Sequence, residues 1–157
     1  MEKPKGRILC VEDDQDTRDM MSALLGLEGY EVVQARNIAE GFNLATSRPF
    51  DLILLDWVFD DGTGIDLCKR LRGNGTHAPV LFCSGIGNRT EIEKAMQAGA
   101  KGFLIKPIDF SDLLQYIGRF VNTGANEHRE QSRPNSFTAG KSLDIPRPPN
   151  STVHQGK

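Results

Sequence analysis

The sequence has no long apolar run and little net charge, and both absences narrow the possible functions. No stretch of its 157 residues approaches the roughly 18 consecutive apolar residues of a membrane-spanning helix, so we expect no membrane partner. The formal net charge of −2 does not favour direct binding to nucleic acid. The N-terminus, MEKPKGR, is charged and does not have the apolar segment of a secretory signal.

Cysteine is also scarce. The chain has three cysteines, Cys10, Cys68 and Cys83, each in an apolar stretch. An odd number of isolated cysteines is not typical of the disulfide framework of a secreted domain. Without a C-x-x-C pair, a zinc site is not indicated either. We interpret the cysteines as reduced residues in or near the core of a cytoplasmic protein.

Large apolar residues become rare after residue 122. The segment 123–157 is rich in Pro, Ser, Asn and Gly, and such a composition cannot bury enough apolar surface to offset the entropy lost on ordering. We therefore expect a folded domain at residues 1–122 and a disordered polar, Pro-rich tail at 123–157. Within the tail, SLDIPRPP is a candidate for a short partner-binding motif.

The first 122 residues alternate strand-like and helix-like stretches five times. Apolar stretches predict strands at residues 7–11, 30–35, 52–56, 79–84 and 101–106. Apolar residues at helical spacing predict helices at 15–27, 38–47, 64–72, 89–98 and 109–121. This alternation predicts right-handed crossovers and a parallel sheet with helices on both faces. We expect an α/β fold, a flavodoxin-like doubly wound (βα)5 domain whose five-stranded parallel sheet has strand order 2-1-3-4-5.

Polar side chains follow four of the five expected strands. Glu12 and Asp13 follow the first strand, Asp56 ends the third, Ser84 ends the fourth and Lys106 ends the fifth. Sites in open α/β sheets form at the carboxyl ends of the strands. We therefore expect these five side chains to meet at one edge of the sheet.

Four other acids near the strand ends have a simpler interpretation. Asp14 and Asp109 each precede a predicted helix, where Asp is a favoured N-cap residue. Asp60 and Asp61 stand beside glycines, as is typical of turns. We expect these four acids to serve the local backbone.

Three carboxylates at one edge need a compensating cation. Two unit charges about 4 Å apart repel by roughly 4 kcal/mol at an effective dielectric constant near 20. Carboxylates without His or Cys nearby favour Mg²⁺ or Mn²⁺. Lys106 adds a positive charge and Ser84 a hydroxyl. Together these groups fit a phosphoryl group held on or near Asp56, because a carboxylate can accept one as a nucleophile.

With these features in place, the sequence resembles the receiver domains of two-component response regulators, in particular the chemotaxis-type single-domain receivers. The matching stretches are ILCVEDD with Arg18 after it, DLILLDWVFDDGTG, PVLFCSG and AGAKGFLIKP. They cover about residues 5–122 in the family's order. Each stretch alone is a weak signal, whereas the ordered set is specific.

The resemblance implies a role for each residue of the acidic group. Asp56 is the implied phosphoacceptor, and Glu12 and Asp13 hold Mg²⁺ with it, directly or through water. The backbone carbonyl of Val58 completes the implied metal site. The phosphoryl donor is then a histidine kinase or a phosphotransfer protein.

The resemblance also implies a switch. Ser84 hydrogen-bonds to a phosphoryl oxygen and Lys106 pairs with it, while the peptide between Lys106 and Pro107 is usually cis in the family. Phe103 stands at the position of the switch aromatic, which turns inward on phosphorylation. That change reshapes the face made by the fourth helix, fifth strand and fifth helix, through which a downstream protein or a second copy of the chain would bind.

The sequence departs from the family at three positions. Asp60 replaces a common Pro four residues after the phosphoacceptor, and this acid could alter metal affinity. Val58 and Ile86 are apolar where the family's residues influence the attack of water. Since neither side chain can hydrogen-bond to that water, we expect phosphorylated Asp56 to be long-lived.

The leading hypothesis is a single-domain response regulator that signals by protein contact and is not an enzyme with a turnover substrate. A phosphorylation-independent interaction module with an impaired site is an alternative, which an absence of Mg²⁺ affinity would favour. A phosphatase with an Asp nucleophile is less consistent, because Val58 stands where such enzymes place a second acid. A flavodoxin is less consistent still, because the acidic loop EDDQDTRD would repel a flavin phosphate.

Overall fold

The computed structural model describes residues 2–121, and the expected tail at 123–157 lies outside these residues. Five parallel strands form the main sheet: β1 (Arg7–Val11), β2 (Glu31–Ala35), β3 (Leu52–Leu55), β6 (Val80–Ser84) and β7 (Gly102–Ile105). Their order is β2-β1-β3-β6-β7. If only these five strands are counted, this is the order 2-1-3-4-5, so the predicted α/β fold is confirmed.

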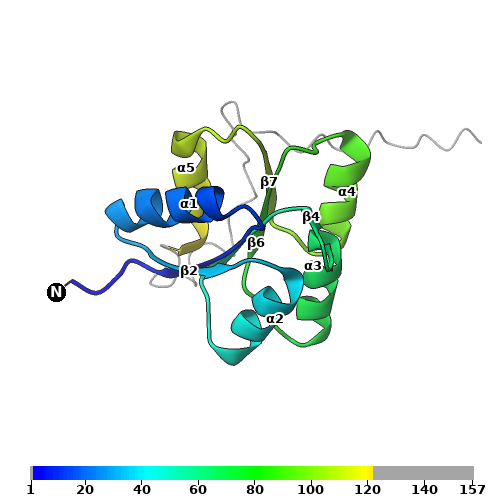
Figure 1. Ribbon diagram of the computed structural model, residues 1–157, viewed down its shortest axis with the longest axis horizontal. Coiled ribbons are helices and arrows are strands. Elements are labelled where there is room, and N and C mark those ends of the chain that lie inside the picture. The colour runs from blue at the N-terminus through cyan, green and yellow to red at the C-terminus, as the bar shows by residue number, and fades with distance from the viewer. Residues whose placement is uncertain (1, 122–157) are drawn as a thin grey trace, which may run out of the picture.

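Five helices cover the two faces of the sheet (Figure 1). Helices α1 (Gln15–Leu27) and α5 (Phe110–Val121) pack on one face. Helices α2 (Ile38–Ser47), α3 (Gly64–Gly73) and α4 (Arg89–Gln97) pack on the other. Alternate residues of β1 face opposite sides, since Leu9 packs with the second group and Ile8 with the first. Both faces are therefore buried, which explains why the strands read as continuous apolar runs.

Side-chain caps and glycines fix where the helices begin and end. Asp14 accepts a hydrogen bond from the N–H of Thr17 at the start of α1. Asp109 accepts hydrogen bonds from two N–H groups at the start of α5. Both predicted caps are confirmed. Gly29 and Gly99 have positive φ angles of 94° and 103° after α1 and α4, a conformation that side chains with a Cβ rarely adopt.

A small hairpin that the sequence did not predict lies between β3 and α3. Its strands are β4 (Val58–Phe59) and β5 (Gly62–Thr63), which pair antiparallel. The carboxylate of Asp61 accepts hydrogen bonds from the N–H groups of Ile38 and Ala39, each at 3.0 Å. Asp61 therefore does more than shape a turn, because it ties the hairpin to the first turn of α2.

Two further sequence expectations concern the cysteines and a membrane-spanning helix. Cys10, Cys68 and Cys83 are buried and free, as predicted. No helix within residues 2–121 has the length and apolar character required to cross a bilayer.

Candidate functional site

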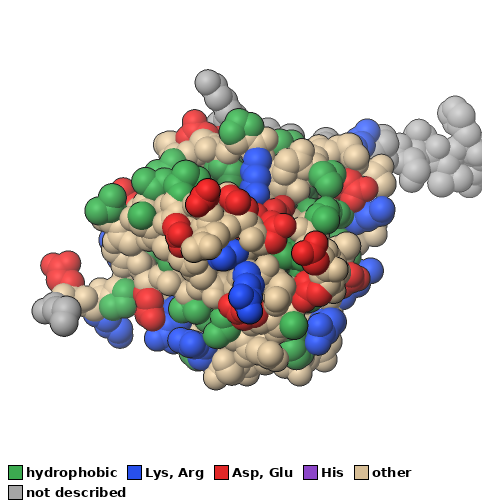
Figure 2. Space-filling model, viewed as in Figure 1, with side chains coloured by type: hydrophobic (Ala, Val, Ile, Leu, Met, Phe, Trp, Pro, Cys, Tyr) green, Lys and Arg blue, Asp and Glu red, His purple; other side chains and the backbone are tan. Residues whose placement is uncertain are grey.

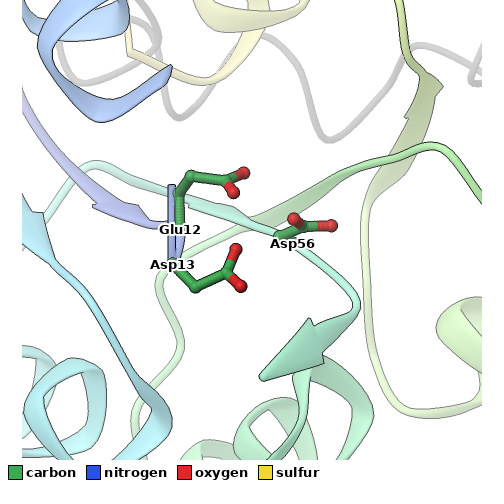
Figure 3. A group of neighbouring side chains, drawn as sticks. All are labelled: Glu12, Asp13 and Asp56. Atoms are coloured by element: carbon green, nitrogen blue, oxygen red, sulfur yellow. The ribbon is translucent and has the colours of Figure 1, made fainter. Parts of the chain in front are cut away.

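The sheet brings three acids together at the carboxyl ends of β1 and β3. These strands are neighbours, and the N–H of Asp56 donates to the carbonyl of Val11. One carboxylate oxygen from each of Glu12, Asp13 and Asp56 lies within 4.8 Å of the others. The three side chains point into one space (Figure 3). Glu12 is buried, Asp56 is partly buried and Asp13 is exposed, so the group opens to solvent on one side.

Lys106 places an ammonium group among these acids. Its Nζ lies 2.7 Å from Glu12 Oε2 and 3.2 Å from Asp56 Oδ2. The other oxygen of Asp56 accepts a hydrogen bond of 2.6 Å from the N–H of Trp57. The chain thus provides part of the positive charge that three clustered carboxylates need.

The pKa values in this group follow from burial and from the neighbouring charges. Burial by itself lowers the pKa of Lys106, but the hydrogen bond to Glu12 and the charge of Asp56 outweigh it and raise that pKa above its ordinary value. Burial raises the pKa of Glu12 to about 7, with Asp13 and Asp56 adding to the rise and Lys106 opposing it. Since burial is the main cause, the rise reflects the poor solvation of Glu12 more than repulsion by the other two acids.

The donor set fits a hard divalent cation. Glu12, Asp13 and Asp56 offer only carboxylate oxygens, which Mg²⁺ and Mn²⁺ prefer. A bound cation would favour the ionised form of Glu12 against the burial that chiefly raises its pKa, and against the smaller contributions of Asp13 and Asp56. The metal-binding role of the Val58 carbonyl stays a prediction. Val58 is 55% exposed and Ile86 40%. Two apolar residues therefore face solvent, each two positions after Asp56 or Ser84 in the chain.

Ser84 joins the group from the neighbouring strand. Its carbonyl accepts a hydrogen bond from the N–H of Lys106, and its hydroxyl accepts one of 3.1 Å from the N–H of Ile86. The Ser84 side chain is buried. The five residues therefore lie at one edge of the sheet, where the Lys106 side chain contacts Glu12 and Asp56 and the Ser84 side chain bonds to its own loop. The peptide between Lys106 and Pro107 is cis.

Phe103 is fully buried in this structure. Its ring centroid is 5.9 Å from that of Phe82 and 6.1 Å from that of Trp57. The structure thus records the inward position of this aromatic ring, while the predicted movement on phosphorylation stays a prediction.

An open hollow of about 400 Å³ lies beside the acids. Its walls include Asp13, Arg18, Arg36 and Asp60. Figure 2 shows acidic and basic side chains gathered together on this face of the molecule. Asp60 therefore lines a polar hollow next to the acidic group.

Arg18 makes contacts that the sequence did not reveal. The sequence marked this residue only as part of a family pattern, yet its guanidinium bonds to the backbone of both Glu12 and Asp13. A side chain that hydrogen-bonds to carbonyl groups leaves no charge pattern in the sequence by which it could be found.

Comparison with known proteins agrees with this geometry. The family model described as the response regulator receiver domain matches residues 8–118. The chain belongs to this family and is a receiver domain of two-component signalling.

Two relatives show the range of proteins in which similar domains occur. The probable transcriptional regulatory protein SilR of Salmonella typhimurium is 34% identical over 118 residues, which cover 75% of this chain and 52% of SilR. The chain thus spans about half the length of this relative. The chemotaxis protein CheY of Bacillus subtilis is 32% identical over 117 residues, which cover 74% of this chain and 98% of CheY.

A solved structure supports the fold. The CheY-like response regulator receiver domain protein of Methanospirillum hungatei superposes with a TM-score of 0.72 at 28% identity. The match covers 77% of this chain and 97% of that protein. The expected sheet order and helix placement are therefore those of known receiver domains.

Proposed function

We propose that the protein accepts a phosphoryl group on Asp56 in a Mg²⁺-dependent reaction and signals by contact with another protein. The observation that carries this proposal is the placement of the Asp56 carboxylate between two further acids and the ammonium group of Lys106. The donor is a histidine kinase or a phosphotransfer protein, and the reaction takes place in the cytoplasm.

Each residue around Asp56 has a part that its position supports. Asp56 supplies the nucleophilic oxygen, while Glu12 and Asp13 hold Mg²⁺, which neutralises phosphoryl charge when bound. Lys106 already hydrogen-bonds to Asp56 and would pair with a phosphoryl oxygen. The Ser84 hydroxyl would donate to another. Each such charge-assisted bond favours the phosphorylated state.

The output is proposed on two grounds. Similarity to CheY along 98% of that protein's length supports signalling by a receiver domain alone, formed here by residues 1–122. A shift of Ser84 on phosphorylation, beside a Phe103 ring that already lies inward, would alter the face of α4, β7 and α5, where a downstream protein or a second copy of the chain would bind. Residues 123–157 form the proposed tail.

One observation favours a second candidate, a receiver-like module that works without phosphorylation. Lys106 bonds to both Glu12 and Asp56, and this arrangement provides positive charge for the acids without any metal. Asp60 adds another acid beside them. A site held in this way could be structural.

Intact-mass measurement after incubation with acetyl phosphate tests the proposal. With Mg²⁺, the wild-type chain should gain one phosphoryl group, and without Mg²⁺ or in the Asp56→Asn variant it should gain none. Asp61→Asn is the matched control, because it removes a carboxylate of the same segment and should still accept the group. No gain in the wild type, together with no Mg²⁺-dependent change in Trp57 fluorescence, would favour the second candidate.

A further inference from the structure

We propose that Arg18 is a positioning residue for the metal site, because it fixes the backbone from which both metal-binding acids project. Its Nη1 donates hydrogen bonds to the carbonyl of Glu12 at 2.6 Å and to the carbonyl of Asp13 at 3.0 Å. The inference rests on the proposed Mg²⁺-dependent function, since it concerns the same acids.

The backbone at these two acids lies between two regular elements. The N–H of Glu12 bonds to the carbonyl of Ala35, beyond the last residue of β1. Helix α1 begins three residues later, at Gln15. The carbonyls of Glu12 and Asp13 thus need partners that neither element's regular pattern provides. Arg18, in the first turns of α1, reaches back to supply a donor for both.

The guanidinium of Arg18 also bonds to a side chain of β2. Arg18 Nε donates to Gln34 Oε1 at 3.3 Å. Gln34 Nε2 in turn donates to Ser22 Oγ at 2.8 Å and to Asp19 Oδ1 at 3.3 Å. A planar group with several fixed donors can bond to the loop and to this support at the same time. The network therefore connects the metal-binding loop to α1 and β2.

The charge of Arg18 and its positioning role predict opposite effects of its removal on Mg²⁺ affinity. Arg18 carries a positive charge near a site for a cation, so as a charge alone it weakens Mg²⁺ binding. Its removal would then strengthen binding. If Arg18 positions the acids, its removal weakens binding, because the carboxylates lose their shared geometry. Loss of groups that orient metal ligands typically lowers metal affinity about 10- to 100-fold.

The experiment is a Mg²⁺ titration of the full chain, followed by Trp57 fluorescence and by calorimetry. Arg18→Met should raise the Kd about tenfold or more. Arg18→Lys, which keeps the charge and a donor, should restore part of the affinity. Arg36→Met is the matched control: Arg36 lines the same hollow, and its Nε lies 3.4 Å from Glu40 on α2. Its loss should leave the Kd unchanged or slightly lower.

The outcomes distinguish failure of the proposed function from failure of the positioning role of Arg18. If the wild type binds no Mg²⁺, the proposed function fails. If the wild type binds and Arg18→Met binds equally or more tightly, the positioning role alone is overturned. If Arg18→Met does not fold by circular dichroism, Gln34→Leu takes its place, because it removes the support and leaves Arg18 present. A Kd raised a few-fold in Gln34→Leu supports the role, and an unchanged Kd contradicts it.

Discussion

Two pairs of strands contribute to the acidic group, and they hold their residues in different ways. On the side of β1 and β3, the backbone itself is tied down: Arg18 bonds to two carbonyls, and the N–H of Gly64 bonds to the carbonyl of Trp57 at 2.7 Å. On the side of β6 and β7, the N–H of Lys106 bonds to the carbonyl of Ser84, and one long side chain, that of Lys106, reaches the acids. Lys106 extends to residues 94 and 50 positions away in the chain, and the Ser84 hydroxyl bonds within its own loop.

In the proposed function, this difference fits separate tasks for the two sides. Metal-binding carboxylates need fixed geometry before the ion arrives, and a restrained backbone supplies it. A group that responds to a phosphoryl group must exchange one set of partners for another, which a long side chain can do at low cost. The β1–β3 side is therefore suited to binding, and the β6–β7 side to response.

Removing the link between the two sides should have the largest effect. In Lys106→Met, the rate of phosphorylation by acetyl phosphate should fall about 100-fold, the usual order for losing one stabilising group at a charged transition state. Mg²⁺ affinity should rise instead, because a competing positive charge leaves the acids. Intact mass and Trp57 fluorescence measure the two effects, and an unchanged rate would exclude a role for Lys106 in the transfer.

A change that displaces the backbone on the β1–β3 side should lower the free energy of unfolding. A Cβ at Gly64 would overlap the backbone oxygen of Asp56 and lie 2.7 Å from Phe82 Cε1. Gly64→Ala should therefore lower the free energy of unfolding by about 1–3 kcal/mol, as overpacking does, and weaken Mg²⁺ binding by moving Asp56. Gly26→Ala is the control, since nothing lies within 4 Å of a Cβ there. Similar urea midpoints for both variants would contradict this interpretation.

Two exposed apolar residues, Val58 and Ile86, lie near the acidic group. Val58 follows β3 and Ile86 follows β6, and neither side chain offers a hydrogen bond to an attacking water. In Val58→Asn with Ile86→Gln, phosphorylated Asp56 should lose its phosphoryl group about tenfold faster, equivalent to about 1.4 kcal/mol in the barrier. The decay of the phosphorylated mass measures this rate. Leu27→Gln, at an 84% exposed position on α1, should leave it unchanged, and an equal rate in the double variant would remove the hypothesis.

The fold was predictable because burial on both faces leaves a direct signal in the sequence. The fourth strand was expected at 79–84 and lies at Val80–Ser84, and the third helix was expected at 64–72 and lies at Gly64–Gly73. The hairpin of β4 and β5 was missed, because two-residue strands show no periodicity.

The candidate site was predictable only as a set of residues at one edge. Parallel strands end together, so Glu12, Asp56 and Lys106 had to lie near one another. Their partners could not be read from the chain, because side-chain directions depend on packing. The Arg18 side chain turns back to carbonyls five and six residues earlier, and Asp61 accepts bonds from residues 22 and 23 positions away; neither direction is set by sequence spacing.

The two hydrogen bonds that Asp61 accepts give the smallest expected effect, at the edge of the hollow that Asp61 also lines. Its hydrogen bonds from the N–H groups of Ile38 and Ala39 lower the pKa of Asp61. A carboxylate with a lowered folded-state pKa adds stability above its unfolded value, and this stability is lost as the pH falls through the folded value. Asp61→Asn keeps one acceptor but replaces the other with a donor. At pH 7 the variant should therefore be less stable by about 0.5–1 kcal/mol, the low end for a helix cap, since Asp61 is exposed and screened by solvent.

The pH dependence separates this contact from a packing effect. In urea unfolding, the difference between Asp61→Asn and the wild type should narrow as the pH falls below about 4, the ordinary range for Asp, because the wild-type carboxylate then becomes protonated. A difference that stays constant from pH 7 downward would show that the loss comes from altered packing of the hairpin. In that case the two charged hydrogen bonds to α2 contribute nothing that an amide cannot, and the position of the hairpin depends on its apolar contacts, among them those of its own buried residue Phe59.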